Sequence, residues 1–164
     1  MSTQLAISVR RARPADAPAL ARLVNRAYAV EQFFVDGDRT SADEIVRMMA
    51  TGEFVVIESP DMLAGAVYVE TRGYFGMLSV DPDFQGMGLG TRLVRIAEAI
   101  CEASGARCVD LKIINLREEL GRWYKSLGYQ EVGIAPYSHR PVKQPCHFVQ
   151  MRKTLTHLSM EAFA

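Results

Sequence analysis

The amino-acid sequence predicts an α/β fold of the α+β type, in which a mixed sheet carries helices on its faces. The main observation is the order of the hydrophobic patterns, which runs strand, two helices, three strands, helix, strand, helix, two strands. The composition agrees, because 164 residues with 49% hydrophobic and 23% charged side chains suit one ordinary globular core. We therefore expect a single domain over residues 1–164.

The first part of the chain is expected to hold a strand and two helices. Residues 6–11 alternate apolar and polar side chains, which is typical of a strand with one buried face. Asp16 is expected to cap a helix whose apolar residues recur at helical spacing, namely Leu20, Leu23, Val24 and Ala27. Residues 31–40 break this pattern and predict a loop, after which Ser41 and Glu44 have the spacing of a capping box for a short helix.

The middle of the chain is expected to form a β-meander followed by a long helix. Apolar, strand-like runs occur at residues 53–58, 63–71 and 74–80, and the short turns between them favour antiparallel pairing. A glycine-rich segment then opens an amphipathic helix. This helix is predicted to run to about Ser104, because Gly105 is a typical stop signal.

The last part of the chain is expected to add a strand, a helix and two further strands. Residues 107–113 have the pattern of a buried strand. Asn115 is a natural cap for a helix that ends at Gly128. The apolar side of that helix is Leu116, Leu120, Trp123, Tyr124 and Leu127. Residues 129–135 and 147–155 then complete the sheet.

Composition excludes several classes of partner. Lysine plus arginine and aspartate plus glutamate number 19 each, so no overall positive charge attracts nucleic acid. Cys101, Cys108 and Cys146 are an odd number without a CxxC pair, so we expect neither a disulfide framework nor a metal site. No apolar stretch has the length of a signal core or a membrane span, and a cytoplasmic protein without a membrane partner is expected.

The segment at residues 80–91 is the most informative one, because Gly86, Gly88 and Gly90 lie there between a strand and an amphipathic helix. Positions without a side chain let a ligand approach the main chain and allow positive φ. The unpaired N–H groups of the first helical turn favour an anion at the same place. We predict a pyrophosphate cradle, and the alternative is a helix start that is merely rich in glycine.

The spacing of these glycines excludes two familiar phosphate-binding loops. The dinucleotide fingerprint requires glycine or alanine where this chain has Thr91. A nucleoside-triphosphate loop requires Gly-Lys-Ser or Gly-Lys-Thr, which does not follow. Binding of some other nucleotide stays open as a minor alternative.

The remaining pattern is Gln85-x-x-Gly88-x-Gly90, preceded by Met77-Leu78-Ser79-Val80-x-Pro82. A second segment runs from Asn115-Leu116 to Trp123-Tyr124-Lys125-Ser126-Leu127-Gly128-Tyr129 and contains the order Tyr-x-x-x-Gly-aromatic. In both motifs the chain resembles the GCN5-related N-acetyltransferases, the GNAT family. The resemblance extends over about residues 7–155.

This resemblance implies a GNAT-like mixed, mostly antiparallel sheet of about six to seven strands, with helices on both faces and a central splayed strand pair. It places the splay between residues 74–80 and 107–113. It also implies acetyl-coenzyme A (acetyl-CoA) as the cosubstrate, with its thioester in the cleft between these strands.

The resemblance also assigns cofactor-binding residues. Main-chain N–H groups of the glycine segment and the Thr91 hydroxyl are expected to hold the pyrophosphate, and the exposed backbone of the preceding strand is expected to pair with the pantetheine amides. Asn115 is expected either to donate to pantetheine or only to cap its helix. The predicted set is Leu78, Ser79, Val80, Gln85, Gly86, Met87, Gly88, Leu89, Gly90, Thr91 and Asn115.

Catalysis is expected to need a proton donor for the departing thiolate and a base for the amine. By the resemblance Tyr124 is the candidate acid, and the alternative is a tyrosine that only packs in the core. Some family members carry a glutamate on the strand before the glycine segment, but here the strand reads Gly76-Met77-Leu78-Ser79. Glu70 is the predicted substitute, followed by Glu31, and the alternative is a reaction that relies on proximity and water.

The acceptor amine is expected to bind between residues 28–39 and 137–145. Acidic residues of the first segment, Glu31, Asp36 and Asp38, are expected to attract a cationic amine. The alternative is a pair of surface loops with their aromatic residues turned inward. The predicted acceptor residues are Tyr28, Glu31, Phe33, Phe34 and Tyr137.

The sequence therefore predicts an N-acetyltransferase that transfers the acetyl group of acetyl-CoA directly to a primary amine. The amine is a small molecule, an amino acid or a peptide, and nucleic acid is not expected as a partner. A non-catalytic acyl-CoA sensor or interaction module is the alternative, because its cofactor motifs would be identical. The oligomeric state is left open, with a homodimer as one form.

Overall fold

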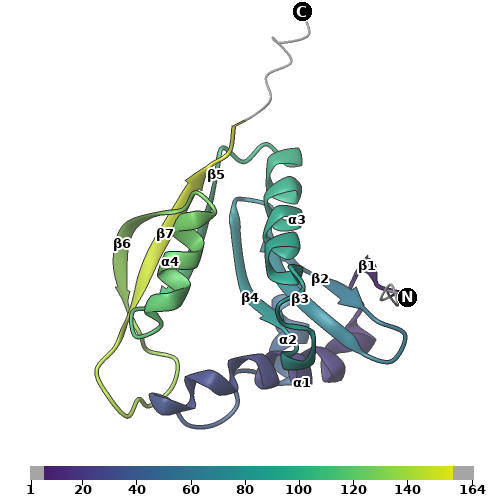
Figure 1. Cartoon of the computed structure of the whole chain (residues 1–164), viewed down its shortest axis with the longest axis horizontal. Coiled ribbons are helices and arrows are strands. Elements are labelled where there is room, and N and C mark those ends of the chain that lie inside the picture. The colour runs from purple at the N-terminus through teal and green to yellow at the C-terminus, as the bar shows by residue number, and fades with distance from the viewer. Residues whose placement is uncertain (1–5, 157–164) are drawn as a thin grey trace, which may run out of the picture.

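The computed structural model describes residues 6–156, which form one seven-stranded sheet and four α-helices (Figure 1). The ends of the predicted domain, residues 1–5 and 157–164, lie outside the described residues. The strands are β1 (Ser8–Arg11), β2 (Glu53–Glu58), β3 (Leu63–Glu70), β4 (Tyr74–Val80), β5 (Cys108–Ile114), β6 (Gln130–Pro136) and β7 (His147–Thr154). The helices are α1 (Ala17–Ala27), α2 (Ala42–Met48), α3 (Leu89–Ala103) and α4 (Glu118–Ser126).

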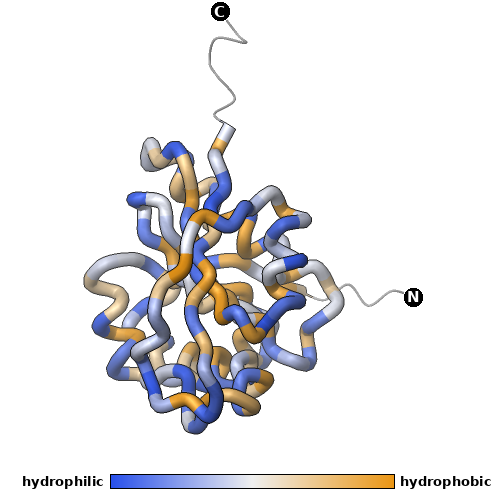
Figure 2. The backbone as a smooth tube through the Cα atoms, turned by 90° about the vertical axis from the view of Figure 1, so that its left-hand side faces the viewer, coloured by the Kyte–Doolittle hydropathy of each residue, from blue (hydrophilic) through white to orange (hydrophobic). Residues whose placement is uncertain are grey.

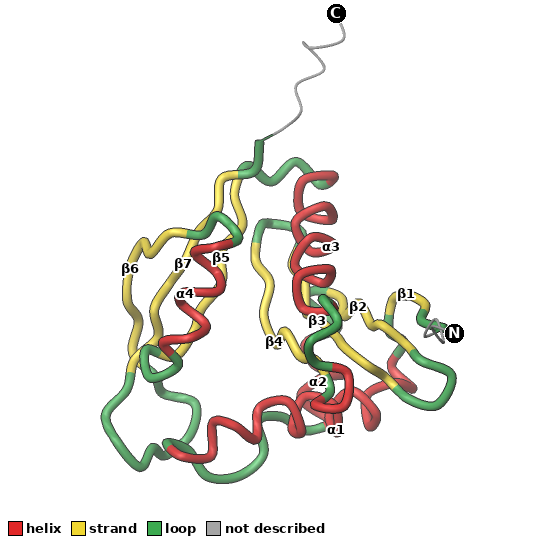
Figure 3. Tube along the Cα trace, in the orientation of Figure 1, coloured by secondary structure: helices red, strands yellow, loops and turns green. Residues whose placement is uncertain are grey.

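The strand order across the sheet is β1-β2-β3-β4-β5-β7-β6. Neighbouring strands are antiparallel except β4 and β5, which run parallel. The described parts of β4 and β5 pair at one position, Tyr74 with Asp110, and then diverge (Figure 3). The predicted mixed sheet with a central splayed pair is confirmed, and the edge of β4 that faces β5 lies open beyond Tyr74.

Helices cover both faces of the sheet, as predicted. The apolar side of α1 packs with α2 against one face, where Leu20, Val24 and Ile45 are fully buried. On the opposite face α3 and α4 pack over β3, β4 and β5, and Leu93 and Ala97 of α3 are fully buried there. In Figure 2 many of the hydrophobic segments, coloured orange, lie toward the middle of the molecule. Within the described part of the chain no helix is long and apolar enough to cross a membrane.

Two predicted helix caps are wrong because their side chains have other partners. Asp16 holds the N-cap position of α1 but makes no cap hydrogen bond to that helix, since its carboxylate accepts from both Arg10 Nη atoms at 2.8 and 2.9 Å and from the preceding Arg13 N–H at 2.7 Å. A bidentate guanidinium is a stronger partner than a neutral N–H group. Asn115 accepts from the backbone N–H of His147 at 2.8 Å, and α4 begins three residues later at Glu118.

Two further predictions for the α1–α2 connection are corrected in part. The predicted loop at residues 31–40 begins as a 3₁₀ helix, Tyr28–Phe33, which continues α1 directly. At α2, the Ser41 hydroxyl accepts from the Glu44 N–H at 3.2 Å as expected. The Glu44 carboxylate instead accepts from the Thr40 hydroxyl at 3.0 Å, so half of the capping box forms.

Candidate active site

The open edge of β4 contains a β-bulge that sequence patterns do not indicate. Ala66 pairs with Ser79 and Tyr68 with Gly76, so β4 has one residue more than β3 in this stretch. Met77 at the bulge has φ of 49°, which is uncommon for a residue with a side chain. Bulges bend a strand and interrupt its pairing, and strained backbone often marks a functional site. Here the bulge lies where β4 separates from β5.

The glycine segment adopts the predicted open conformation at the start of α3. Gly86 and Gly88 have φ of 80° and 79°, and no atom lies within 4 Å of a Cβ built at either position. Within the described chain, no hydrogen bond is formed by the backbone N–H groups of residues 85–88. The first turn of α3 adds further unpaired N–H groups. The segment is therefore an open row of donors at a helix N-terminus, which favours an anion.

The third glycine has a different role. Gly90 lies in the first turn of α3, and a Cβ there would meet the Trp123 ring of α4 at 3.5 Å. This distance is an ordinary van der Waals contact, so Gly90 lies beside the Trp123 ring without glycine being required there. Around it, the Met87 side chain is exposed, Leu89 points into the core, and Thr91 is half-buried. The side chains of Met87, Leu89 and Thr91 do not line the cavity described below.

A cavity of about 240 Å³ lies between the diverging strands. It is lined by the bulged part of β4, by β5, by α4, and by both segments predicted to receive the acceptor. Seven predicted site residues line it, namely Tyr28, Glu31, Leu78, Val80, Gln85, Tyr124 and Tyr137.

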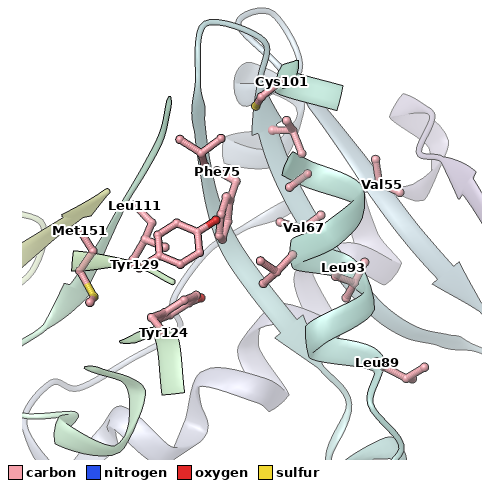
Figure 4. Packing of buried hydrophobic residues seen from close by; sticks show 14 of the residues in the cluster. Val55, Val67, Phe75, Leu89, Leu93, Cys101, Leu111, Tyr124, Tyr129 and Met151 are labelled. Atoms are coloured by element: carbon pink, nitrogen blue, oxygen red, sulfur yellow. The ribbon is translucent and has the colours of Figure 1, made fainter. Parts of the chain in front are cut away.

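Tyr124 lies at the inner wall of this cavity and is 5% exposed. Its ring packs edge-on against Trp123 and Tyr129 and lies beside Phe75, and Figure 4 shows Phe75, Tyr124 and Tyr129 gathered in one place. Among the described residues its hydroxyl has no hydrogen-bond partner, and burial raises its pKa above the ordinary value. Tyr124 is thus packed in the core and also presents a protonated hydroxyl at the cavity.

Glu31 is the buried carboxylate of this cavity. It is 6% exposed, and its Oε2 accepts from Arg117 Nη1 at 3.1 Å. Burial raises the pKa of Glu31, while the charge of Arg117 acts in the opposite direction. The lining of the cavity therefore includes one carboxylate with an increased affinity for a proton, Glu31, and the protonated phenol of Tyr124.

Comparison with known proteins identifies the family. The family model described as an acetyltransferase (GNAT) domain matches residues 24–155. The chain belongs to the GNAT acetyltransferase family. No curated protein matches the sequence.

Solved structures share the GNAT fold at low sequence identity. The ribosomal-protein-S18-alanine N-acetyltransferase from Escherichia coli aligns with a TM-score of 0.78 and 17% identity, over 94% of this chain and 97% of that one. An N-acetyltransferase from Staphylococcus aureus Mu50 aligns with a TM-score of 0.73 and 15% identity, over 92% of this chain and 99% of that one. YncA from Salmonella typhimurium, a putative acetyltransferase solved with its cofactor acetyl-CoA, aligns with a TM-score of 0.71 and 19% identity, over 94% of this chain and 97% of that one.

Three residues predicted for the GNAT site do not have side chains in the cavity. Glu70 pairs with Arg72 at 2.8 Å and accepts from the Tyr68 hydroxyl at 3.2 Å, outside the cavity. The Ser79 side chain points away, since its hydroxyl donates to the Met77 carbonyl at 3.0 Å. Asn115 instead joins the ends of β5 and β7 through His147. Glu31, and not the predicted Glu70, is therefore the carboxylate that lines this cavity.

Phe33 and Phe34 do not line the cavity either. Phe33 is 51% exposed, and Phe34 is fully buried against Val35 and Ile114. Sequence reasoning treated the two aromatic residues as equivalent. The turn of the 3₁₀ helix sends one outward and the other into a small satellite core.

The two segments predicted to bind the acceptor lie against each other. The N–H of Lys143 donates to the Phe34 carbonyl at 2.7 Å, and Val35 pairs with Val142. Arg140 donates to the carbonyls of Gly37 and Asp38. A second cavity, of about 610 Å³, lies between these segments, α2 and β4.

Several cavity residues were not named as site residues from the sequence, although Arg39 ends one of the two segments expected to bind the acceptor. Arg39 and Tyr74 line both cavities, while Lys112, Arg117 and Phe148 line the first. Arg39 follows the Asp36-Gly37-Asp38 turn, a signal that marks a loop but not the direction of its side chains. Tyr74, Lys112 and Phe148 lie on strands, and Arg117 lies at the start of α4. Which of these side chains reach the cavity depends on how β4 and β5 diverge, and local sequence patterns do not show this.

Proposed function

We propose that this protein is an N-acetyltransferase that transfers the acetyl group of acetyl-CoA directly to a primary amine. One observation carries the proposal. A single cavity between the splayed strands reaches Gln85, at the start of the open glycine cradle, and is also lined by Tyr124 and the buried Glu31. This arrangement provides anion binding, an acid and a base along one path.

The cradle suits the pyrophosphate of acetyl-CoA. The empty space at Gly86 and Gly88 lets phosphate oxygens approach the free N–H groups of residues 85–88 and the start of α3. The open edge of β4 at Leu78 and Val80 is available to the pantetheine amides, in the manner of an added strand. The acetyl-CoA of the YncA structure supports this assignment.

The reaction needs the amine nitrogen to lose a proton, because amines with a pKa of about 10.4 are protonated at neutral pH. Glu31 accepts this proton, and the raised pKa of its carboxyl makes it a better base than an exposed glutamate. The nitrogen then forms a bond to the thioester carbonyl carbon. The tetrahedral intermediate loses a second proton from nitrogen to water, and the C–S bond breaks. Tyr124 donates a proton to the departing thiolate and regains one through water, so the net reaction releases one proton to solvent.

The first experiment measures cofactor binding through Trp123, the single tryptophan, which packs on Gly90 beside the cradle. Acetyl-CoA should change its fluorescence, and pooled amines should then release free thiol. Gly88→Ala places a methyl group in the phosphate path and is expected to weaken binding about tenfold. Gly105→Ala is the matched control, because Gly105 also has positive φ and open space but lies beyond the other end of α3.

Binding with thiol release supports the enzyme. Binding without release from any amine favours the acyl-CoA sensor, for which the missing carboxylate on β4 is an argument. Equal affinity in the two glycine variants, or no binding in the native protein, rejects the cradle.

A further inference from the structure

Arg39 is a cation between the two cavities with no acidic partner among the described residues. It follows the 3₁₀ helix Tyr28–Phe33, is half-buried and lines both cavities. Its Cζ atom lies 5.5 Å from the centroid of the Tyr28 ring, which holds the guanidinium by a cation–π contact. By contrast, Arg117 in the same cavity pairs with both Glu31 and Glu119.

The charges around Arg39 leave the acceptor end of the first cavity positive. The Glu31 carboxylate forms its ion pair with Arg117 and is also attracted by the charge of Arg39, so two cations share one carboxylate, and Lys112 adds a further cation beside Phe148. His139 adds no charge near neutral pH, because burial and then the charge of Arg39 lower its pKa. Asp36, which the sequence suggested as an attraction for cations, is 83% exposed and paired with Lys143 at 2.9 Å.

The second cavity contains acidic groups, but they do not neutralise Arg39. Glu44 accepts from the Thr40 hydroxyl, and neither Glu44 nor Asp38 forms an ion pair with Arg39. A half-buried guanidinium without a counter-ion carries a desolvation cost that an anionic ligand would offset. Its planar fork of N–H groups matches a carboxylate or another oxyanion in a bidentate way.

We propose that Arg39 binds an anionic group of the acceptor, so that the substrate is a small amine that also carries a carboxylate or phosphonate, such as a free amino acid. This inference rests on the proposed acetyl transfer. Glu31 and Arg39 both line the cavity, so the amine would face the carboxylate while the anionic end faces the guanidinium.

Matched substrate pairs test this assignment. Free amino acids are compared with their carboxamides, which keep the amine and the side chain but lose the negative charge, and aminoalkylphosphonates form a third arm. We expect kcat/KM for the acids to exceed that for the amides about ten- to a hundredfold. The carboxylate and phosphonate arms distinguish the two sources of the anion.

Three variants locate the effect. Arg39→Gln should lower kcat/KM for the acids to the value for the amides without changing acetyl-CoA binding. Arg39→Lys should restore part of the preference for the acids. Arg47→Gln is the control, because Arg47 is exposed on α2 and lines neither cavity. Calorimetric titration of the same pairs into protein saturated with coenzyme A gives the preference independently of turnover.

The inference is overturned if the amides react or bind as well as the acids. It is also overturned if Arg39→Gln keeps the preference for the acids, or if the acids do not bind. Failure of the proposed function has a different signature, namely no acetyl-CoA binding at Trp123 or no thiol release from any amine.

Discussion

Tyr124 and Tyr129 share one aromatic cluster but differ in the surroundings of their hydroxyl groups. The Tyr129 hydroxyl donates to Glu98 at 3.0 Å, whereas that of Tyr124 faces the cavity without a partner among the described residues. The rings contribute packing in both cases. The two hydroxyls should therefore serve different purposes, one catalytic and one structural.

Substitution by phenylalanine separates these purposes. Tyr124→Phe keeps the ring and removes only the free hydroxyl, so we expect kcat to fall about 10²- to 10⁴-fold while acetyl-CoA binding and the urea midpoint stay unchanged. Tyr129→Phe should lower the free energy of unfolding by about 1 kcal/mol, because it removes the hydroxyl that donates to buried Glu98 while Lys153 and Arg95 still donate to this carboxylate, and should keep kcat within a few-fold. Native rates in Tyr124→Phe would show that this tyrosine only packs.

Glu31 predicts a pH dependence of activity. Its folded pKa is raised above the ordinary value of 4.5 by burial, so the proton-accepting form is lost at a higher pH than for an exposed glutamate. We expect kcat/KM to fall as the pH decreases through this raised value, and Glu31→Gln to lower the rate and abolish the acidic limb. Asp36→Asn, an exposed carboxylate of the same segment, is the control, and a limb that survives in Glu31→Gln would exclude this base.

Among the single elements, the start of α1 is stabilised by an ion pair between Asp16 and Arg10. Arg10 of β1 pairs with Asp16 at 2.8 Å and with Glu58 of β2 at 2.8 Å, so one guanidinium ties the helix start to two strands. The hydrogen bond from Arg10 lowers the pKa of Asp16 from 3.8 to about 2. The charged form of Asp16 is therefore favoured by the fold.

This pair predicts an acid-sensitive stability. Because the folded pKa of Asp16 is depressed, its contribution is present above pH 3.8 and is lost as the pH falls toward about 2. After allowance for solvent screening we expect about 1 kcal/mol. Urea unfolding at pH 5 and pH 2.5 should show a smaller loss for Asp16→Asn than for the native chain. Asp61→Asn, an exposed carboxylate in the β2–β3 turn, is the comparison, and equal losses in all three proteins would refute the contribution.

The two halves of the molecule, which diverge at the cavity, are joined by a buried polar cluster. Glu98 of α3 is 7% exposed and accepts from Lys153 of β7 at 3.0 Å and from the Tyr129 hydroxyl. Arg95 adds an ion pair from the partly exposed side of α3. This cluster connects the α3 side of the splay to the β6–β7 side, so it should help to maintain the spacing of the cavity walls.

Removal of Glu98 should destabilise the whole fold. Glu98→Ala leaves Lys153 and Tyr129 without their acceptor, and we expect a cost of about 3–5 kcal/mol in urea unfolding. Arg95→Ala should cost less than about 1 kcal/mol, because it removes only a partly exposed partner. Similar midpoints for the two variants would mean that the cluster does not join the halves.

The order of elements and the glycine cradle were predictable because they depend on local patterns. Period-2 and helical spacing report which face of an element is buried, and this identified all seven strands and four helices. Gly86 and Gly88 adopt positive φ as expected, since that conformation depends mainly on the residue itself. Tyr124 was found through a motif of α4 and its flanking residues, and it lines the cavity in the structure.

The composition of the cavity was decided by tertiary structure. The bulge at Met77 depends on the register with β3, and the partners of Asp16 and Asn115 lie on other elements. Arg39 enters the site because two distant segments meet. Local sequence patterns specify how each segment buries its apolar side, whereas the direction and pairing of a polar side chain depend on which distant groups compete for it, and those are known only once the chain has folded.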